Sequence, residues 1–313
     1  MKKLSVIIPC YNEEESIPYF FEAMEKVQEQ IEYQFEYIFV NDGSKDDTLG
    51  VLRSLHASNL DKVSYLSFSR NFGKEAALYA GLKEATGELV TIMDVDLQDP
   101  PELLPQMIAG ITEEDYDCVG TRRADRKGEP VIRSLFAKIF YRMENKVSST
   151  EMVDGARDFR LMTRQMVDAI LQMSEYNRFS KGLFAWVGFK TKYISFENVE
   201  RTHGKTSWNF FSLFRYSVEG IINFSEFPLR LATFFGTLSF VVAFVMAIFF
   251  TLRTLFFGNP TDGWTSTTVI ILFIGGVQLL ALGVIGEYIG RIFLETKKRP
   301  VFIVQETSRK KEE

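Results

Sequence analysis

The stretch that decides the fold runs from Leu89 to Pro101 and reads LVTIMDVDLQDPP. Five apolar or small residues followed at once by polar ones are typical of a short buried strand and the loop after it. Alternate residues of an extended segment point the same way, so the side chains of Asp94 and Asp96 face one side. Gln98 continues that alternation. The stretch therefore predicts a strand with a row of oxygen ligands at its carboxyl end.

Three further apolar runs precede this strand, at Leu4–Ile8, Tyr37–Val40 and Val63–Phe68. Helical stretches separate or follow the runs, at Glu14–Gln30, Asp47–Ala57, Lys74–Ala85 and Pro101–Ile111. Strands that alternate with helices predict an α/β fold in which a mostly parallel sheet is covered on both faces. Ligands of such sheets bind outside the carboxyl ends of the strands.

Polar residues also follow the first and second strands, at Pro9–Glu13 and Asn41–Ser44. A lone Asp or Ser before a helix is usually only a helix cap. Asp94 and Asp96 differ, because two neighbouring carboxylates repel each other unless a cation lies between them. Carboxylate and amide oxygens are the ligands that Mg²⁺ and Mn²⁺ prefer. The sequence contains no GxGxxG and no GxxxxGK[ST] motif, which excludes dinucleotide and P-loop sites.

The charge and cysteine content narrow the class of protein. The 313 residues carry 36 Lys and Arg against 41 Asp and Glu, a net charge of -5. Binding to nucleic acid requires a basic surplus or a basic stripe, so nucleic acid is excluded as a partner. Two cysteines form no disulfide framework, which favours a reducing compartment for the polar part of the chain.

Two long stretches without charge predict a membrane hairpin, at Leu231–Leu252 and Gly263–Gly286. Each would reach roughly 33–36 Å as a helix, enough for a hydrocarbon core of about 30 Å. We therefore expect membrane helices at about 231–252 and 266–287; a pair of buried core helices is the alternative. Glycines give the second helix a small-residue face that lets helix backbones approach closely, namely Gly275, Gly276, Gly283, Gly286 and Gly290.

The basic residues predict the orientation of this hairpin. Nine flank the two stretches, whereas the short turn between them carries Arg253 alone. The positive-inside rule then leaves both termini and the polar domain in the cytoplasm, on the inner membrane. Enzymes with a single hairpin often self-associate, so a homo-oligomer is possible, but no motif fixes its size.

Three motifs carry a resemblance to a known family: SVIIPCYNEE at 5–14, NDGS at 41–44 and DVDLQDPPE at 94–102. With the hairpin, they resemble the polyprenyl-phosphate glycosyltransferases of glycosyltransferase family 2, which have the GT-A fold. The resemblance covers nearly the whole chain. It implies a catalytic domain at 1–206, an interfacial helix at 207–229, two membrane helices within 230–290 and a cytoplasmic tail at 291–313.

The resemblance also implies roles for single residues. The nucleoside of the donor would be held by Pro9, Tyr11, Glu13 and Asp42, and the cation that bridges to its diphosphate by Asp94, Asp96 and Gln98. GARDFRL at 155–161 is similar to a stretch in which the Asp, here Asp158, faces the acceptor. RTHGKTSW at 201–208 is similar to a cationic loop over the phosphates, here with Arg201 and Lys205. Two departures are Asn41-Asp42 in place of paired Asp and Thr206-Ser207 in place of Ser-Lys.

The implied reaction moves a sugar from a nucleotide diphosphate to a polyprenyl phosphate with inversion, and UDP-glucose is the first choice of donor. UDP-N-acetylglucosamine is second and GDP-mannose third. A cation, Mg²⁺ or Mn²⁺, would stabilise the departing diphosphate. A phosphomonoester is mostly dianionic at pH 7, so a strong base is optional. Asp96 and Asp158 are the expected catalytic residues, with Asp158 as a base or orienting group; a structural ion pair with Arg157 or Arg160 is the alternative.

The acceptor keeps its tail in lipid, so part of the domain must meet the membrane surface. Val131–Arg142 mixes apolar and basic residues in a helical rhythm that suits an interfacial helix, where Arg133 would meet the lipid phosphate. A buried helix is the alternative. Trp208–Phe227 is expected to lead into the membrane, and the charged tail after Gln305 to be a solvated end.

Two other functions compete with this reading. A processive polysaccharide synthase would share the nucleotide and metal motifs, but the chain has no QxxRW motif and two helices make a poor polymer channel. A non-catalytic sensor or scaffold that binds nucleotide-sugars would have no need of an intact set of Asp94, Asp96, Gln98 and Asp158.

Overall fold

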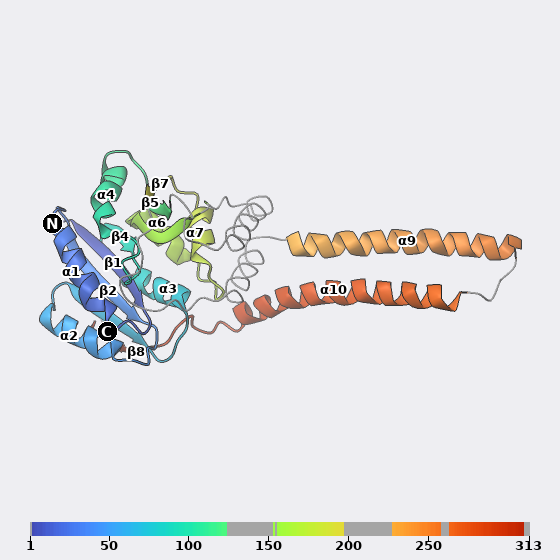
Figure 1. The fold of residues 1–313 in the computed structure, drawn as a ribbon, viewed down its shortest axis with the longest axis horizontal. Helices are drawn as coiled ribbons and strands as arrows, with labels where there is room; N and C mark the ends of the chain where they lie inside the picture. The colour runs from blue at the N-terminus through green and yellow to red at the C-terminus, as the bar shows by residue number, and fades with distance from the viewer. Residues whose placement is uncertain (1, 124–152, 154, 197–226, 258–262, 310–313) are drawn as a thin grey trace. The chain divides into compact units, whose positions relative to one another are not determined.

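The computed structural model describes residues 2–123, 153, 155–196, 227–257 and 263–309 (Figure 1). The chain divides into two compact units. The N-terminal unit consists of Met1–Gly220 together with Arg299–Glu313, and the second unit is Ile221–Lys298. Residues from Arg299 onward therefore belong to the N-terminal unit, although the whole second unit lies between them and Gly220 in the sequence.

One sheet forms the centre of the N-terminal unit, and its described strands follow the order β7-β5-β6-β4-β1-β2-β3-β8. The strands are β1 Lys3–Cys10, β2 Gln34–Asn41, β3 Val63–Phe68, β4 Leu89–Ile92, β5 Cys118–Arg123, β6 Ala156–Thr163, β7 Thr191–Phe196 and β8 Val304–Thr307. Strands β1 to β4 are parallel to one another, whereas β6 runs antiparallel between β4 and β5. The predicted mostly parallel sheet is confirmed.

Helices cover both faces of this sheet. They are α1 Ser16–Gln28, α2 Thr48–Ser58, α3 Lys74–Glu84, the short 3-10 helix η1 Pro101–Leu103, α4 Leu104–Thr112, α6 Arg164–Gln172 and α7 Ser180–Trp186. The four predicted strands and four predicted helical stretches are confirmed, with ends that differ by a few residues. Strands β5 to β8 and helices α6 and α7 were not predicted.

The alternation of side chains along β1 explains the layers. Leu4, Val6 and Ile8 point to the face covered by α1, α2 and α4, and Ile7 points to the face covered by α3, α6 and α7. Each such buried aliphatic side chain stabilises the fold by roughly 1.5–3 kcal/mol. Helix α3 packs closely against its face of the sheet because Gly81 has no side chain. A Cβ at that position would lie 2.2 Å from Ile7 Cγ2.

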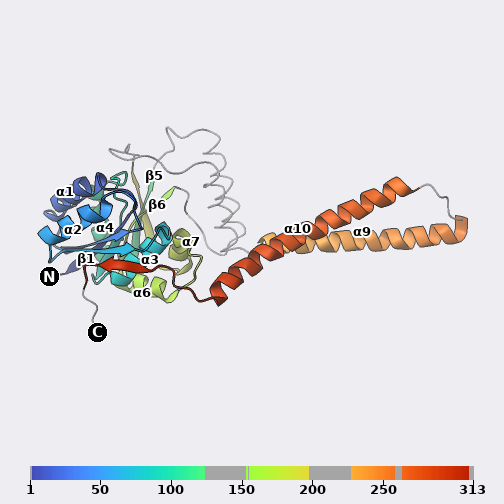
Figure 2. The same cartoon turned by 90° about the horizontal axis from the view of Figure 1, so that it is seen from below.

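Strand β8 returns to the sheet as an edge strand, so the expectation of a solvated end after Gln305 is wrong for the described residues up to Arg309. Strand β8 pairs antiparallel with β3. In Figure 2, β8 is the red arrow that lies beside the other strands of the sheet. Glu306 accepts hydrogen bonds from Arg53 Nε at 2.8 Å and from the Tyr65 hydroxyl at 2.8 Å. The charges of this tail are therefore matched to partners on β3 and α2, which composition alone does not reveal.

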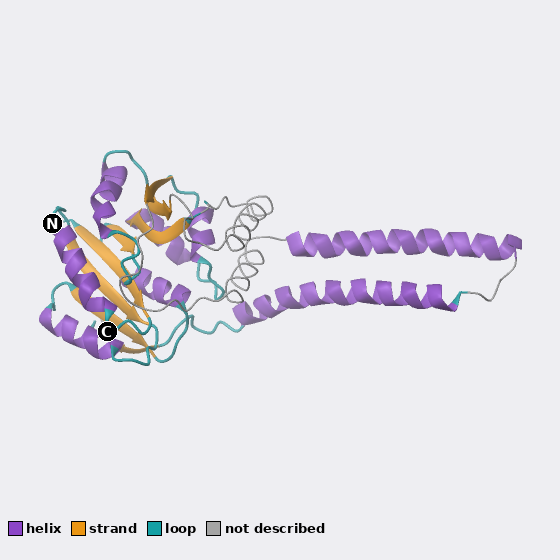
Figure 3. Ribbon diagram, viewed as in Figure 1, coloured by secondary structure: helices purple, strands orange, loops and turns teal. Residues whose placement is uncertain are grey.

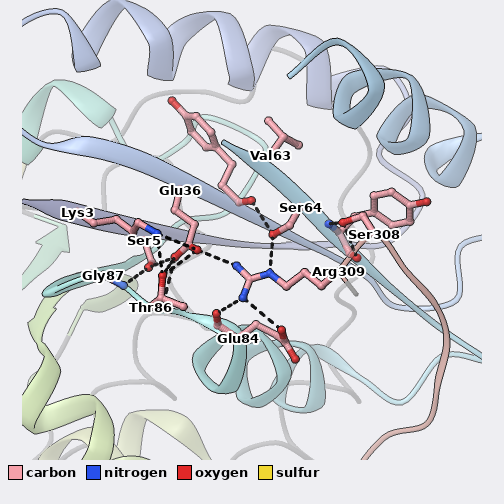
Figure 4. Close-up of polar contacts among 12 residues, drawn as sticks. Lys3, Ser5, Glu36, Val63, Ser64, Glu84, Thr86, Gly87, Ser308 and Arg309 are labelled. Carbon is pink, nitrogen blue, oxygen red and sulfur yellow. Dashed lines mark hydrogen bonds and ion pairs between the residues drawn. The ribbon is translucent and has the colours of Figure 1, made fainter. Parts of the chain in front are cut away.

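Arg309 completes this attachment (Figure 4). Its Nη2 lies 2.8 Å from Glu36 Oε1, and its Nη1 lies 2.5 Å from the Glu84 carbonyl oxygen and 3.3 Å from Glu84 Oε2. Glu36 is on β2 and Glu84 ends α3, so one guanidinium joins the tail to a strand and a helix. We call Glu306 and Arg309, with these partners, the C-terminal clasp.

The second unit contains two long helices, α9 at Phe227–Phe257 and α10 at Trp264–Thr296 (Figure 3). The two helices contact each other. Within the described residues, one segment, Phe273–Thr296, is long and apolar enough to cross a membrane, and Leu231–Met246 is a shorter apolar segment. None of the Phe273–Thr296 window is buried in protein, which argues against a buried core helix there. The two-helix hairpin stays a prediction.

The glycine face of α10 does not pack as expected. A Cβ added at Gly275, Gly276, Gly283, Gly286 or Gly290 would meet no heavy atom of the described chain within 4 Å. The prediction that these glycines allow close approach of the two helices is therefore wrong for this structure. The exposed surface of the two helices is formed by large apolar side chains, such as Phe240, which is 69% exposed, and Leu279, which is 72% exposed.

Candidate active site

The candidate site lies where parallel strands end. Cys10 of β1 is opposite Asn41 of β2 in the sheet, so the loops after these two strands begin side by side. Ile92 of β4 lies opposite Arg160 of β6. The same antiparallel register, continued by two residues on each strand, brings Asp94 opposite Asp158. The sheet thus brings two carboxylates together at one edge, Asp94 and Asp158, and Asp96 follows Asp94 in the loop after β4. We call these three residues the acidic edge.

Lys74, the first residue of α3, joins two of these carboxylates. Its Nζ lies 2.7 Å from Oδ1 and 2.9 Å from Oδ2 of Asp94, and 2.5 Å from Oδ2 of Asp158. The three side chains are 20–37% exposed, so they are only partly screened by water. An ammonium group between two carboxylates offsets the repulsion that would otherwise separate them.

A short loop fixes the position of this lysine. The carboxylate of the buried Asp42 accepts a hydrogen bond from the backbone N–H of Phe72 at 2.6 Å and from that of Gly73 at 2.9 Å. Gly73 has a φ of 98°, a conformation that favours glycine, and α3 begins at the next residue. Burial raises the pKa of Asp42, although the two N–H donors and Arg70 act in the opposite direction. Asp42 thus orients the loop that carries Lys74.

The charges of the cluster stabilise one another. Burial alone would raise the pKa of Asp158, but the charges of Lys74 and Lys181, the hydrogen bond from Lys74 and the charge of Arg160 hold that pKa well below its usual range. Burial likewise opposes the charge on Lys74, but the two carboxylates raise its pKa well above the usual value. Asp158 is therefore a carboxylate at neutral pH and a weak proton acceptor.

The loop after β4 bends sharply at Leu97. This residue has a φ of 54°, an uncommon conformation for a side chain of this size that costs of order 1–3 kcal/mol. The bend lets the backbone N–H of Gln98 donate to Asp96 Oδ1 at 3.2 Å. Asp96 is buried, at 8% exposure, and Gln98 is half-buried, so both side chains are largely shielded from solvent. Such strain is found most often at functional sites.

The donor set of this edge fits a hard divalent cation by its chemistry. Asp94 and Asp96 supply carboxylate oxygens and Gln98 an amide oxygen, which are suitable ligands for Mg²⁺ or Mn²⁺. No group of three or more His, Cys, Asp and Glu side chains in the described ranges is arranged to hold a metal ion. A cation would therefore need ligands beyond these two carboxylates and the amide, and it would share Asp94 with Lys74.

The predicted nucleoside-binding residues of the first loop lie at the same edge. Tyr11 is 41% exposed, and Glu13 Oε2 accepts a hydrogen bond from Ser16 Oγ at 2.7 Å. Pro9 is half-buried in β1. The loop is held to the loop after β2, because the backbone N–H of Asn12 donates to Ser44 Oγ at 2.9 Å. The structure thus brings the first two predicted loops together.

The alternative that Asp158 forms a structural ion pair with Arg157 or Arg160 is wrong. Arg157 Nε lies 2.7 Å from Oδ1 of the buried Asp99. Arg160 donates to the backbone oxygens of Asp158 and Arg157, at 3.3 and 2.9 Å, and its guanidinium lies 3.8 Å from the centre of the Phe184 ring. Among the described residues, Lys74 is the cation that contacts the carboxylate of Asp158, and the charges of Lys181 and Arg160 also act on it.

Lys74 is the residue that sequence reasoning missed. It stood in the sequence as the start of a helical stretch, where a cation is unfavourable because the helix dipole places positive charge at that end. A lysine at a helix start, where its charge is unfavourable, was the sequence feature that could have indicated a carboxylate partner. Arg133, Arg201 and Lys205, the other predicted cations, lie outside the described residues, as do the segments Val131–Arg142 and 207–226.

Comparisons with known proteins agree with these observations. The family model "Glycosyl transferase family 2" matches residues 5–171. The chain is 43% identical to a prophage bactoprenol glucosyl transferase homolog of Escherichia coli (strain K12), over 97% of this chain and 98% of that protein. It is 42% identical to the SfII prophage-derived bactoprenol glucosyl transferase of Shigella flexneri, over 98% of this chain and 99% of that protein.

Among solved structures, mannosyl-3-phosphoglycerate synthase from Rubrobacter xylanophilus aligns with a TM-score of 0.49 and 18% identity, over 71% of this chain and 73% of that chain. The family model covers more than half of the chain, and the relatives match it almost end to end. The resemblance in the strand-end motifs is thereby confirmed, and this chain belongs to glycosyltransferase family 2.

Proposed function

We propose that this protein transfers glucose from UDP-glucose to the phosphate of a polyprenyl phosphate, undecaprenyl phosphate first, with inversion at the anomeric carbon. The observation that carries the proposal is the acidic edge, where the sheet of a family 2 chain gathers Asp94 and Asp158 around Lys74. Nearly full-length relatives named as bactoprenol glucosyl transferases support the acceptor and the sugar. UDP-N-acetylglucosamine is the second choice of donor and GDP-mannose the third.

The donor nucleotide would bind at the loops after β1 and β2. The exposed ring of Tyr11 offers a flat surface for a base; Pro9 lies near the end of β1, and Glu13 follows Tyr11 in the loop after that strand. Asp42 would act from the loop after β2, where its carboxylate also holds the loop that follows β3. Arg201 and Lys205 would add cations over the phosphates, as a fork and as a point charge.

A divalent cation, Mg²⁺ or Mn²⁺, would be held by Asp94, Asp96 and Gln98. When bound, it would supply positive charge to the diphosphate as that group departs. Asp96 has a fixed orientation for this purpose, since its Oδ1 accepts the N–H of Gln98. Asp94 would contribute from the end of β4, where Lys74 contacts both of its oxygens.

Asp158 would orient the site rather than remove a proton. Its pKa is held well below the usual range, so it accepts a proton poorly at neutral pH. The acceptor phosphate does not require a base, because a phosphomonoester with a second pKa of about 6 is mostly dianionic at pH 7. Asp158 would hold Lys74 in place next to the reacting groups, and Arg133 would meet the phosphate of the lipid.

The acceptor also explains the apolar helices. A polyprenyl tail lies in the bilayer, so the enzyme must work at the membrane surface. The segment Phe273–Thr296 has the length and composition of a membrane span. We propose that α9 and α10 form a membrane hairpin in the cytoplasmic membrane, with both termini and the catalytic unit on the cytoplasmic side.

The proposal is tested with purified full-length protein in detergent, undecaprenyl phosphate, Mn²⁺ or Mg²⁺ and one radiolabelled donor at a time: UDP-glucose, UDP-N-acetylglucosamine or GDP-mannose. We expect UDP-glucose to give a lipid-extractable product that carries a single sugar and that disappears with a chelator. A labelled polymer would indicate a polysaccharide synthase instead. The absence of a chelator-sensitive lipid product with every donor would contradict the proposal.

A further inference from the structure

The position of Lys74 is costly and therefore informative. A cation in the first turn of a helix is destabilised by the positive end of the helix dipole. Lys74 is the first residue of α3, and the acidic edge offsets that cost through contacts of 2.5–2.9 Å with Asp94 and Asp158. The lysine thus depends on the two carboxylates, and the two carboxylates depend on the lysine.

Lys74 and a divalent cation would compete for the carboxylate oxygens of Asp94. Its Oδ1 and Oδ2 both lie within hydrogen-bond distance of Lys74 Nζ. A divalent cation held by Asp94, Asp96 and Gln98 would require at least one of the same oxygens, and it would repel the ammonium. Asp158 offers Lys74 a second partner on the opposite strand, at 2.5 Å. The lysine can therefore keep one ion pair when it gives up the other.

We propose that Lys74 is the positioning residue of the acidic edge: it bridges Asp94 and Asp158 in the donor-free enzyme and withdraws to Asp158 when a divalent cation takes Asp94. The flexible four-carbon stem of lysine permits this movement, whereas the Asp42 loop fixes the backbone from which the stem starts. This inference rests on the divalent cation of the proposed function.

The inference is tested by direct Mn²⁺ binding, without acceptor and without turnover. The unbound Mn²⁺ is measured by its electron paramagnetic resonance signal, in full-length protein saturated with UDP. Lys74→Met removes the competing charge and is expected to tighten Mn²⁺ binding by about tenfold or more, while kcat falls. Lys83→Met, in the last turn of the same helix, is the matched control and is expected to bind Mn²⁺ as the wild type does.

The direction of the change in Mn²⁺ affinity distinguishes the inference from a merely structural role of Lys74. A lysine that only holds the fold together would, when removed, loosen the site and leave Mn²⁺ binding equal or weaker. That result in a folded Lys74→Met protein would overturn the inference. If Lys74→Met does not fold, Lys74→Gln serves in its place, because the amide removes the charge but still donates hydrogen bonds. Its Mn²⁺ affinity must rise in the same way, and an unchanged or weaker affinity overturns the inference too.

The wild type distinguishes this inference from the proposed function. A wild-type protein that binds no Mn²⁺ in the presence of UDP would contradict the proposed cation and, with it, the role of Lys74. A wild type that binds Mn²⁺, with lysine variants that bind it no more tightly, would contradict the role of Lys74 alone. Lipid product formed by the wild type would then still support the proposed transfer.

Discussion

The acidic edge and the C-terminal clasp use the same chemistry at opposite ends of one sheet. At the acidic edge, Lys74 lies between Asp94 and Asp158, beyond the carboxyl end of β4. In the clasp, Arg309 lies between Glu36 and Glu84, near the amino end of β2 (Figure 4). Each cluster thus places one basic side chain between two carboxylates.

The two clusters differ in how firmly they are held. Glu36 also accepts hydrogen bonds from Ser5 Oγ at 2.5 Å and from the Thr86 N–H at 3.1 Å, and Arg309 presents a rigid fork. The acidic edge relies on a single ammonium on a flexible stem. The clasp is therefore suited to permanent attachment, whereas the acidic edge is suited to an exchange of cations. Loss of the clasp should therefore lower the free energy of unfolding, whereas loss of the acidic edge should lower kcat.

The largest expected effect is on turnover at the acidic edge. Asp158→Asn removes the second partner of Lys74, and we expect kcat to fall by roughly 10²–10³, the size of other losses of preorganised charge at active sites. Asp168→Asn, which alters an exposed carboxylate on α6, is the matched control and should keep wild-type kcat. Measured with labelled donor and lipid phosphate, an unchanged kcat in Asp158→Asn would erase the contrast between the clusters.

The next effect is on the stability of the clasp. Arg309→Met leaves two partly buried carboxylates without their cation, and we expect a loss of about 1–3 kcal/mol, since the guanidinium is 26% exposed. For a unit of this size each kcal/mol corresponds to a fall of about 2–4 °C in Tm. Thermal unfolding in detergent measures the change, and kcat of the remaining folded enzyme should stay within twofold. A large fall in kcat at unchanged Tm would reverse the assignment.

The smallest effect concerns acid stability. The hydrogen bonds from Arg53 and Tyr65 lower the pKa of Glu306 to about 2, from an ordinary value of 4.5. Because the folded pKa is the lower one, Glu306 contributes its full stabilisation above about pH 4.5 and loses it as the pH falls toward 2. Glu306→Gln should therefore flatten the decline of Tm across that range, whereas Glu32→Gln, an exposed position, should not. Parallel curves for Glu306→Gln and wild type would show that the clasp does not titrate.

Much of the fold was predictable because the sequence shows the apolar runs of the strands and the helical stretches between them. The apolar runs of β1 to β4 lie in the interior of the sheet, where both faces are buried, and such runs are visible without a partner. Strand β6 reads ARDFRLMT and β8 reads VQET, and neither has the continuous apolar character that marks a buried strand. Their places depend on pairing with distant strands, β8 with a segment more than 230 residues earlier. Local pattern carries no information on such pairs.

The candidate site was predictable to the extent that strand ends decide it. Asp94 and Asp96 stood out because a strand of known type ends beside them, and Asp158 entered through family resemblance. Lys74 did not stand out, because its partner carboxylates come from two other elements and meet it only in the folded sheet. The clasp was missed for the same reason. Arg309 appeared as one charge in a charged tail, and its ion-pair partners, Glu36 and Glu84, lie on β2 and α3.

The most direct test of the whole account is transfer of labelled glucose from UDP-glucose to undecaprenyl phosphate by Asp96→Ala, compared with wild type in the same preparation. The account predicts chelator-sensitive lipid product in the wild type, product at background level in Asp96→Ala, and the same Tm for both proteins. Near-normal transfer by Asp96→Ala would contradict it, because the cation could then not be held where we place it.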